Sequence, residues 1–215
     1  MTATQTFQGY FMEIYSTALL TSIFAFFFAT SITPGPNNIM LLSSGLTFGY
    51  RKTVPHLLGV VLGFPLMALI VGLGLGKIFE SYPVVLTILK IIGTAYLLWL
   101  AWKIANSTPS LNEDESSKQP LKFIPIVLFQ WVNPKNWIKI ITAMSVYVHS
   151  AENALSQIII ITIIFLSTVI VSANSWTLGG VALKRFIKNT KAIRAFNISM
   201  AVLLILSIIF SFWNT

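Results

Sequence analysis

Long apolar segments recur along this chain, and each has the length that a helix needs to cross a lipid bilayer. A transmembrane helix takes about 20 mostly apolar residues at about 1.5 Å rise per residue. The segments lie at about 17–38, 56–76, 83–102, 123–148, 154–176 and 195–213. They show no alternation of period two, the pattern of membrane strands. The sequence therefore predicts an all-α integral membrane protein with six transmembrane helices.

The scarcity of charged residues also indicates that a lipid bilayer surrounds the protein. Only 9% of the 215 residues are charged and 55% are hydrophobic, whereas a soluble domain has about 25% charged residues. Six acidic and 14 basic side chains would not cover the surface of a water-soluble domain. The absence of Cys excludes disulfides, thiolate metal sites and cysteine nucleophiles. Residues 1–17 hold no Lys or Arg, so we expect no cleaved signal and a first segment that is retained.

The net charge of +8 is distributed unevenly between the connections. With the N-terminus outside, ten basic residues fall on the cytoplasmic side: Arg51, Lys52, Lys103, Lys118, Lys122, Lys184, Arg185, Lys188, Lys191 and Arg194. The outer connections hold only Lys77. This bias predicts that both termini are outside, and it accounts for the basic charge without a nucleic-acid partner. For the cluster 184–194, a nucleotide or regulatory site is the alternative to orientation against anionic lipid.

A polar, proline-flanked stretch at 106–120 divides the chain and is typical of a cytoplasmic linker. The halves, 1–105 and 121–215, contain three predicted spans each. Because three is odd, the second half enters the membrane from the opposite side. The sequence therefore predicts a single membrane domain made of two inverted three-helix repeats.

The first predicted span of each half is interrupted at a proline motif. The motifs are Thr33-Pro-Gly-Pro-Asn-Asn38 and Gln130-Trp-Val-Asn-Pro-Lys-Asn136. Proline removes a backbone donor, and broken helices at membrane depth occur where protein or a water-filled cavity satisfies the freed groups. Matching breaks in inverted halves indicate a transporter's central site. The alternative is that the prolines only kink the helices for packing.

A broken helix offers carbonyls on one side and amides on the other, which suit the ammonium and carboxylate of a zwitterion with a small apolar body. The candidate substrate-binding residues are Thr33, Pro34, Gly35, Pro36, Asn37, Asn38, Gln130, Asn133, Pro134, Lys135, Asn136 and Asn174. For Asn174 the alternative is a helix–helix hydrogen bond. No catalytic residue, metal or cofactor is predicted.

Two lysines lie in the fourth predicted span. A buried ammonium costs at least about 2.5–3.5 kcal/mol, so Lys135, near the middle, should face a cavity, a carbonyl cluster or a bound anion. The alternative is that both lysines lie in the cytoplasmic interface. Lys139 lies four residues further on the same helix face, and its side chain is long enough to snorkel. In the second span, the spacing of Gly59 and Gly63 indicates close helix approach.

At the two breaks the sequence resembles the LysE/RhtB-type family of amino-acid exporters. The resemblance rests on both motifs, on Gly45 and Gly49-Tyr-Arg51, and on Gly93-Thr-Ala-Tyr-Leu-Leu-Trp-Leu-Ala-Trp102, and it covers nearly the whole chain. It implies efflux of small amino acids across a bacterial cytoplasmic membrane, coupled to the proton gradient. Members that export lysine or arginine carry an Asp in these breaks, where this chain has Asn. The departure favours neutral substrates, as in the homoserine- and threonine-exporting branch.

Two other function classes were weighed. An intramembrane enzyme is disfavoured because His56 and His149 are assigned to opposite membrane faces, and Ser43 and Ser44 have no base nearby in sequence. A channel or ion exporter is disfavoured by the shortage of carboxylates, which selective cation pathways use. Proton relays use Asp, Glu or His within the membrane, and with none clearly inside the spans, Lys135 becomes the candidate proton carrier. A homo-oligomer is left open.

Overall fold

The computed structural model describes residues 16–75, 81, 83–106, 120–148, 153–186 and 190–213. Across these ranges the regular structure is helical, which confirms the all-α prediction. The elements are α2 (Thr17–Ile32), α3 (Pro36–Ile70) with a π-helical turn (Val71–Leu75), α5 (Pro83–Ala105), α6 (Phe123–Val132), α7 (Pro134–Tyr147), α8 (Ala154–Phe186) and α9 (Thr190–Trp213). Most of the predicted linker (107–119), Lys77, Lys188 and His149 lie outside the described residues.

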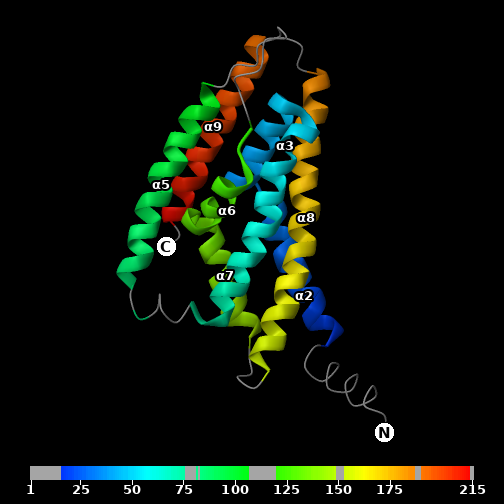
Figure 1. Ribbon diagram of the computed structural model, residues 1–215, viewed down its shortest axis with the longest axis vertical. Helices are drawn as coiled ribbons and strands as arrows, with labels where there is room; N and C mark the ends of the chain where they lie inside the picture. Colours follow the sequence, from blue (N-terminus) through cyan, green and yellow to red (C-terminus); the bar gives the residue numbers. More distant parts are fainter. Residues whose placement is uncertain are drawn as a thin grey trace.

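Helix α3 reverses direction at Gly49. The backbone of Gly49 has φ 77° and ψ 171°, a conformation that glycine adopts without a Cβ clash. The Ser44 Oγ lies 3.0 Å from the His56 Nδ1, although the two residues are 12 apart in sequence. In a straight helix they would be about 18 Å apart. α3 therefore consists of a first limb, residues 36–48, and a second limb, residues 50–70, that lie side by side (Figure 1).

The reversal corrects the predicted bounds of the first two spans. The first was expected to end near residue 38, but helix continues through the first limb of α3 to the turn at Gly49. The second was expected to begin at residue 56, but the second limb begins directly after Gly49 because one glycine is enough for the turn. α8 and α9 also extend beyond the predicted 154–176 and 195–213, since a helix continues past its apolar part.

The helices pack around α3. Its main neighbours are α8 and α6, while α5 packs on α9 and α2 on α8 (Figure 1). Gly59 and Gly63 lie directly against Ile126 and Val127 of α6, the close approach that their spacing predicted. The interface between α3 and α8 is closer still: a Cβ on Gly180 would meet the backbone of Leu42.

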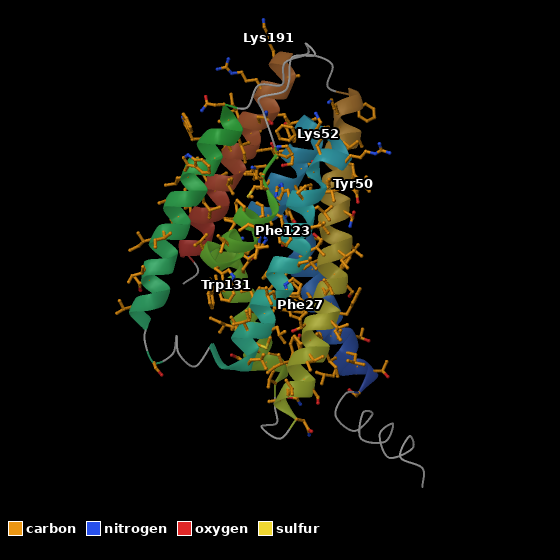
Figure 2. All side chains as sticks on the ribbon, viewed as in Figure 1. Phe27, Tyr50, Lys52, Phe123, Trp131 and Lys191 are labelled. Atoms are coloured by element: carbon orange, nitrogen blue, oxygen red, sulfur yellow. The ribbon has the colours of Figure 1, made fainter. Side chains whose placement is uncertain are left out.

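Apolar side chains cover much of the outer surface, including exposed Leu62, Ile91 and Ile163. Two described stretches, Pro36–Gly74 and Ala154–Lys184, have the length and apolarity to cross a membrane, although the first contains the reversal at Gly49. Figure 2 places Lys52 and Lys191 at the same end of the bundle. At this end α3 reverses, α5 and α8 end, and α9 begins (Figure 1).

Candidate functional site

The carbonyl groups at the end of α2 are bonded by side chains from other helices. The Ser31 carbonyl accepts from the Asn38 side-chain NH2 at 2.6 Å and from the Ser172 hydroxyl at 2.7 Å. The Ile32 carbonyl accepts from the Trp176 indole at 3.1 Å. These donors come from α3 and α8, so the surrounding protein satisfies groups that the end of the helix leaves without intrahelical partners.

Lys135 lies against the same helix end. Its Nζ donates to the Pro34 carbonyl at 2.9 Å, to the Thr33 Oγ1 at 3.0 Å and to the Thr33 carbonyl at 3.4 Å. The side chain passes so close to Gly35 that a Cβ there would be 2.8 Å from the Nζ. The carbonyl cluster expected around Lys135 is thus present, and the negative end of the α2 dipole adds to its stabilisation.

A buried amide network joins the two proline motifs. The Asn37 side-chain NH2 donates to the Gln130 Oε1 at 2.8 Å, and the Asn136 side-chain NH2 donates to the same oxygen at 2.9 Å. The Asn133 side chain caps α7 by accepting from the Lys135 backbone NH at 3.2 Å. α3 and α7 each begin with a proline, whose fixed φ suits a first helical position. Both helix starts therefore belong to one cluster of polar side chains.

Lys139 is buried and does not snorkel. Its Nζ lies 3.5 Å from the Ser31 Oγ and 4.7 Å and 5.4 Å from the ring centres of Phe64 and Phe165. The rings come from the second limb of α3 and from α8, which enclose α7 at this depth. The spacing from Lys135 indicated the helix face, but nothing local to Lys139 in sequence indicated what covers that face.

A small cavity lies between these groups. Its lining comprises Thr30, Ser31, Gly35, Pro36, Asn37, Asn38, Val60, Phe64, Asn133, Lys135, Asn136, Lys139, Val169, Ser172 and Ala173. The volume is about 30 Å³, which is room for about one water molecule. An amino acid needs more space, so side chains or helices must move before one can enter.

Most of the predicted site residues meet at this cavity. Four others are not lining residues but adjoin them: Thr33 and Pro34 are bonded to Lys135, Gln130 is bonded to Asn37 and Asn136, and Pro134 begins α7 beside Lys135. Asn174 is not among the lining residues. Its Oδ1 accepts from the Tyr50 hydroxyl at 2.6 Å, the helix–helix bond that was its alternative role. Sequence reasoning missed Ser31, Phe64, Phe165 and Ser172.

The fold brings His56 to Ser44, which has no base nearby in sequence. The Ser44 hydroxyl lies 3.0 Å from the Nδ1 of the fully buried His56 imidazole, although the two residues are 12 apart in the chain. Among the described residues no carboxylate lies beside this pair, and all six acidic residues fall outside the described ranges. The same ranges contain no group of three or more His, Cys, Asp or Glu residues that could hold a metal ion.

The cavity is electropositive. Its described lining includes two lysines and no acidic residue, and the starts of α3 and α7 add the positive ends of two helix dipoles. The polar oxygens around it belong to neutral amides and hydroxyls. Such a site can stabilise a carboxylate and disfavours an extra cationic side chain.

Comparison with known proteins finds one matching family model and several curated relatives. The family model described as LysE type translocator matches residues 28–210. The cysteine/O-acetylserine efflux protein of Salmonella typhimurium (strain LT2) is 33% identical over 187 residues, which cover 87% of this chain and 94% of the relative. The protein of the same name from Escherichia coli (strain K12) is 32% identical over the same shares. No solved structure gives a significant match.

Proposed function

The chain belongs to the LysE type translocator family, and on this premise we propose that it exports neutral amino acids or their derivatives from the cytoplasm. It is a transporter and not an enzyme, as the family match and the efflux proteins related to it indicate. The names of those relatives add cysteine and O-acetylserine to the threonine, homoserine and small aliphatic amino acids expected from the sequence.

One observation carries the choice of neutral substrates. Two lysines and no acidic side chain line the described cavity. If lysine or arginine were the cargo, its side chain would place an additional positive charge beside Lys135 and Lys139. The described lining has no counter-ion for that charge. A zwitterion of zero net charge avoids this cost because its carboxylate meets the ammonium groups and its ammonium meets amide and carbonyl oxygens.

The proposed membrane arrangement has six spans in two inverted halves, with both termini outside the cytoplasmic membrane of a bacterium. α2 with the first limb of α3 forms one broken span, and α6 with α7 forms the other. In support, the helices end or begin at the two proline motifs. Lys52 and Lys191 also lie at one end of the bundle (Figure 2), as the positive-inside rule requires for a cytoplasmic face.

The proposed substrate site is the cavity between the two proline motifs. Its volume of about 30 Å³ is too small for an amino acid, so transport requires the cavity to widen. In the described conformation the carbonyls of Thr33 and Pro34 hold the Lys135 ammonium beside this cavity.

The decisive experiment is efflux from preloaded cells or vesicles. We expect export of O-acetylserine, cysteine, threonine, homoserine or leucine at rates well above those of lysine and arginine. We also expect export to slow when the proton gradient is collapsed, because the gradient is the proposed driving force. Preferred export of lysine would contradict neutral cargo, and flux that is insensitive to the gradient would indicate a channel.

A further inference from the structure

We propose that Lys139 binds the carboxylate of the transported amino acid, an inference that rests on the proposed function. Within the described residues, the ammonium of Lys139 has one hydrogen bond, to the Ser31 Oγ, and its length is 3.5 Å. Charge-assisted bonds between an ammonium and an oxygen are typically about 2.7–2.9 Å long. Lys139 is thus a buried cation whose hydrogen-bonding capacity is largely unused.

The contrast with Lys135 assigns the two lysines different roles. The Lys135 ammonium has three oxygen contacts at the end of α2, the shortest 2.9 Å, to the Pro34 carbonyl. Lys139, four residues later, has aromatic faces where Lys135 has oxygens: Phe64 and Phe165 lie 4.7 Å and 5.4 Å from its Nζ. Cation–π contacts offset part of the lost hydration, but they accept no conventional hydrogen bond.

Within the described part of the chain, no carboxylate contacts Lys139. The acidic residues of the chain are Glu13, Glu80, Glu113, Asp114, Glu115 and Glu152. None of them lies in the described helices. A buried charge without a partner is expensive, so an anionic group that enters the cavity gains most at this ammonium.

The surroundings define the class of ligand. Lys139 lines the cavity together with the start of α3 at Pro36 and Asn37, where the helix dipole also favours a negative group. The apolar side chains of Val60, Val169 and Ala173 line the same space. The ligand is therefore an α-amino acid that presents a free carboxylate and a small uncharged side chain. Amines and carboxamides of the same size should be rejected.

The test compares an amino acid with its own carboxamide. The probe pair is whichever of threonine, homoserine and O-acetylserine the wild type exports fastest, and the carboxamide of that compound. Binding to purified protein is measured by calorimetry and export from proteoliposomes by efflux. For the wild type we expect the amino acid to bind about 10- to 100-fold more tightly than the carboxamide, the range for a hydrogen bond to a charged group.

In Lys139→Met the difference between acid and carboxamide should fall below about threefold, whereas Lys139→Arg should retain most of it. Met is close to Lys in length and removes only the buried charge, so the variant is expected to fold, which thermal unfolding in detergent checks. Lys122→Met, at an exposed residue before α6, is the matched control and should keep the wild-type difference.

The result that overturns the proposal is a folded Lys139→Met that discriminates acid from carboxamide as the wild type does. A failure of the proposed function looks different, because the wild type would then export none of the neutral amino acids tested in the efflux experiment. Loss of discrimination in Lys122→Met as well would also contradict a specific role for Lys139.

Discussion

Asn37 and Gln130, 93 residues apart in the chain, are joined by a hydrogen bond of 2.8 Å from the Asn37 side-chain NH2 to the Gln130 Oε1. The bond connects the start of α3 with the end of α6, and therefore the two proline motifs. Gln130 also donates to the Ile126 carbonyl at 2.8 Å and accepts from Asn136 at 2.9 Å. One fully buried amide thus fixes the relative position of both helix starts at the cavity.

Gln130→Leu should lower stability by about 1–3 kcal/mol for each buried amide left without its acceptor. Asn37 and Asn136 both lose a partner, so the melting temperature in detergent should fall clearly. In the double variant that adds Asn37→Leu, the loss of stability should be smaller than the sum of the losses in the two single variants, because the bond can be lost only once. Asn106→Ala is the control, because this exposed residue follows α5 and its side chain is bonded to a carbonyl of that helix. Strictly additive losses of stability in the Gln130 and Asn37 variants would contradict the network.

Gly35→Ala should slow export by about tenfold. The added Cβ would lie 2.8 Å from the Lys135 Nζ, so the ammonium must leave the Pro34 carbonyl and lose a charge-assisted bond. In a Lys135→Ala background the same substitution should have no further effect on the efflux rate. An equal slowing in both backgrounds would show that the lysine is not the cause.

Gly180→Ala should destabilise the protein by about 1–3 kcal/mol, the usual cost of forcing extra volume into a packed site. Its Cβ would meet the Leu42 backbone, which has no room to retreat between α3 and α8. Gly179→Ala is a control at the neighbouring residue, because its Cβ would have an ordinary contact of 3.5 Å with the Leu42 side chain. Similar melting temperatures for the two variants would contradict the close approach.

Ser44→Ala should cost about 1–3 kcal/mol, because it leaves the Nδ1 of a buried imidazole without its hydrogen bond. The other ring nitrogen of His56 already has no partner within the described part of the chain. Ser167→Ala, at an exposed hydroxyl bonded inside α8, should change stability by less than about 0.5 kcal/mol. Thermal unfolding measures both, and equal effects would remove the support for this bond between the limbs of α3.

Lys135→Met tests the proton path. If Lys135 carries the coupling proton, the variant should lose export driven by the proton gradient, and its remaining efflux should not respond to a protonophore. The wild type and Lys122→Met should both slow when the gradient collapses. Full gradient-driven export by Lys135→Met would exclude this lysine as the carrier.

The positions of most helices could be predicted from the hydropathy of neighbouring residues. Hydropathy located every described helix except the first limb of α3, since an apolar run of sufficient length is a property of neighbouring residues. The limits near residue 50 were wrong because the reversal depends on the backbone angles of Gly49 alone. The sequence around it, Gly49-Tyr-Arg-Lys52, is polar enough to be taken for a longer connection.

Part of the candidate site could likewise be predicted from the sequence, and part of it could not. The proline motifs and the position of the half-buried Lys135 against carbonyl groups follow from missing backbone donors and from a charge inside an apolar span. The sequence could not place Lys139, because the choice between snorkelling and burial depends on Phe64 and Phe165, which belong to other helices. Asn174 was included for its polarity alone, and its partner Tyr50 lies 124 residues away.

The sequence by itself determined the solvent, the helical class, the positions of the proline motifs and the shortage of carboxylates, because each depends on residue types within a few positions of one another. Only the tertiary structure decided which groups share the cavity. Ser31, Phe64, Lys139 and Ser172 come from α2, α3, α7 and α8. Their meeting depends on the rotation and depth at which helices pack, and no local pattern specifies either quantity.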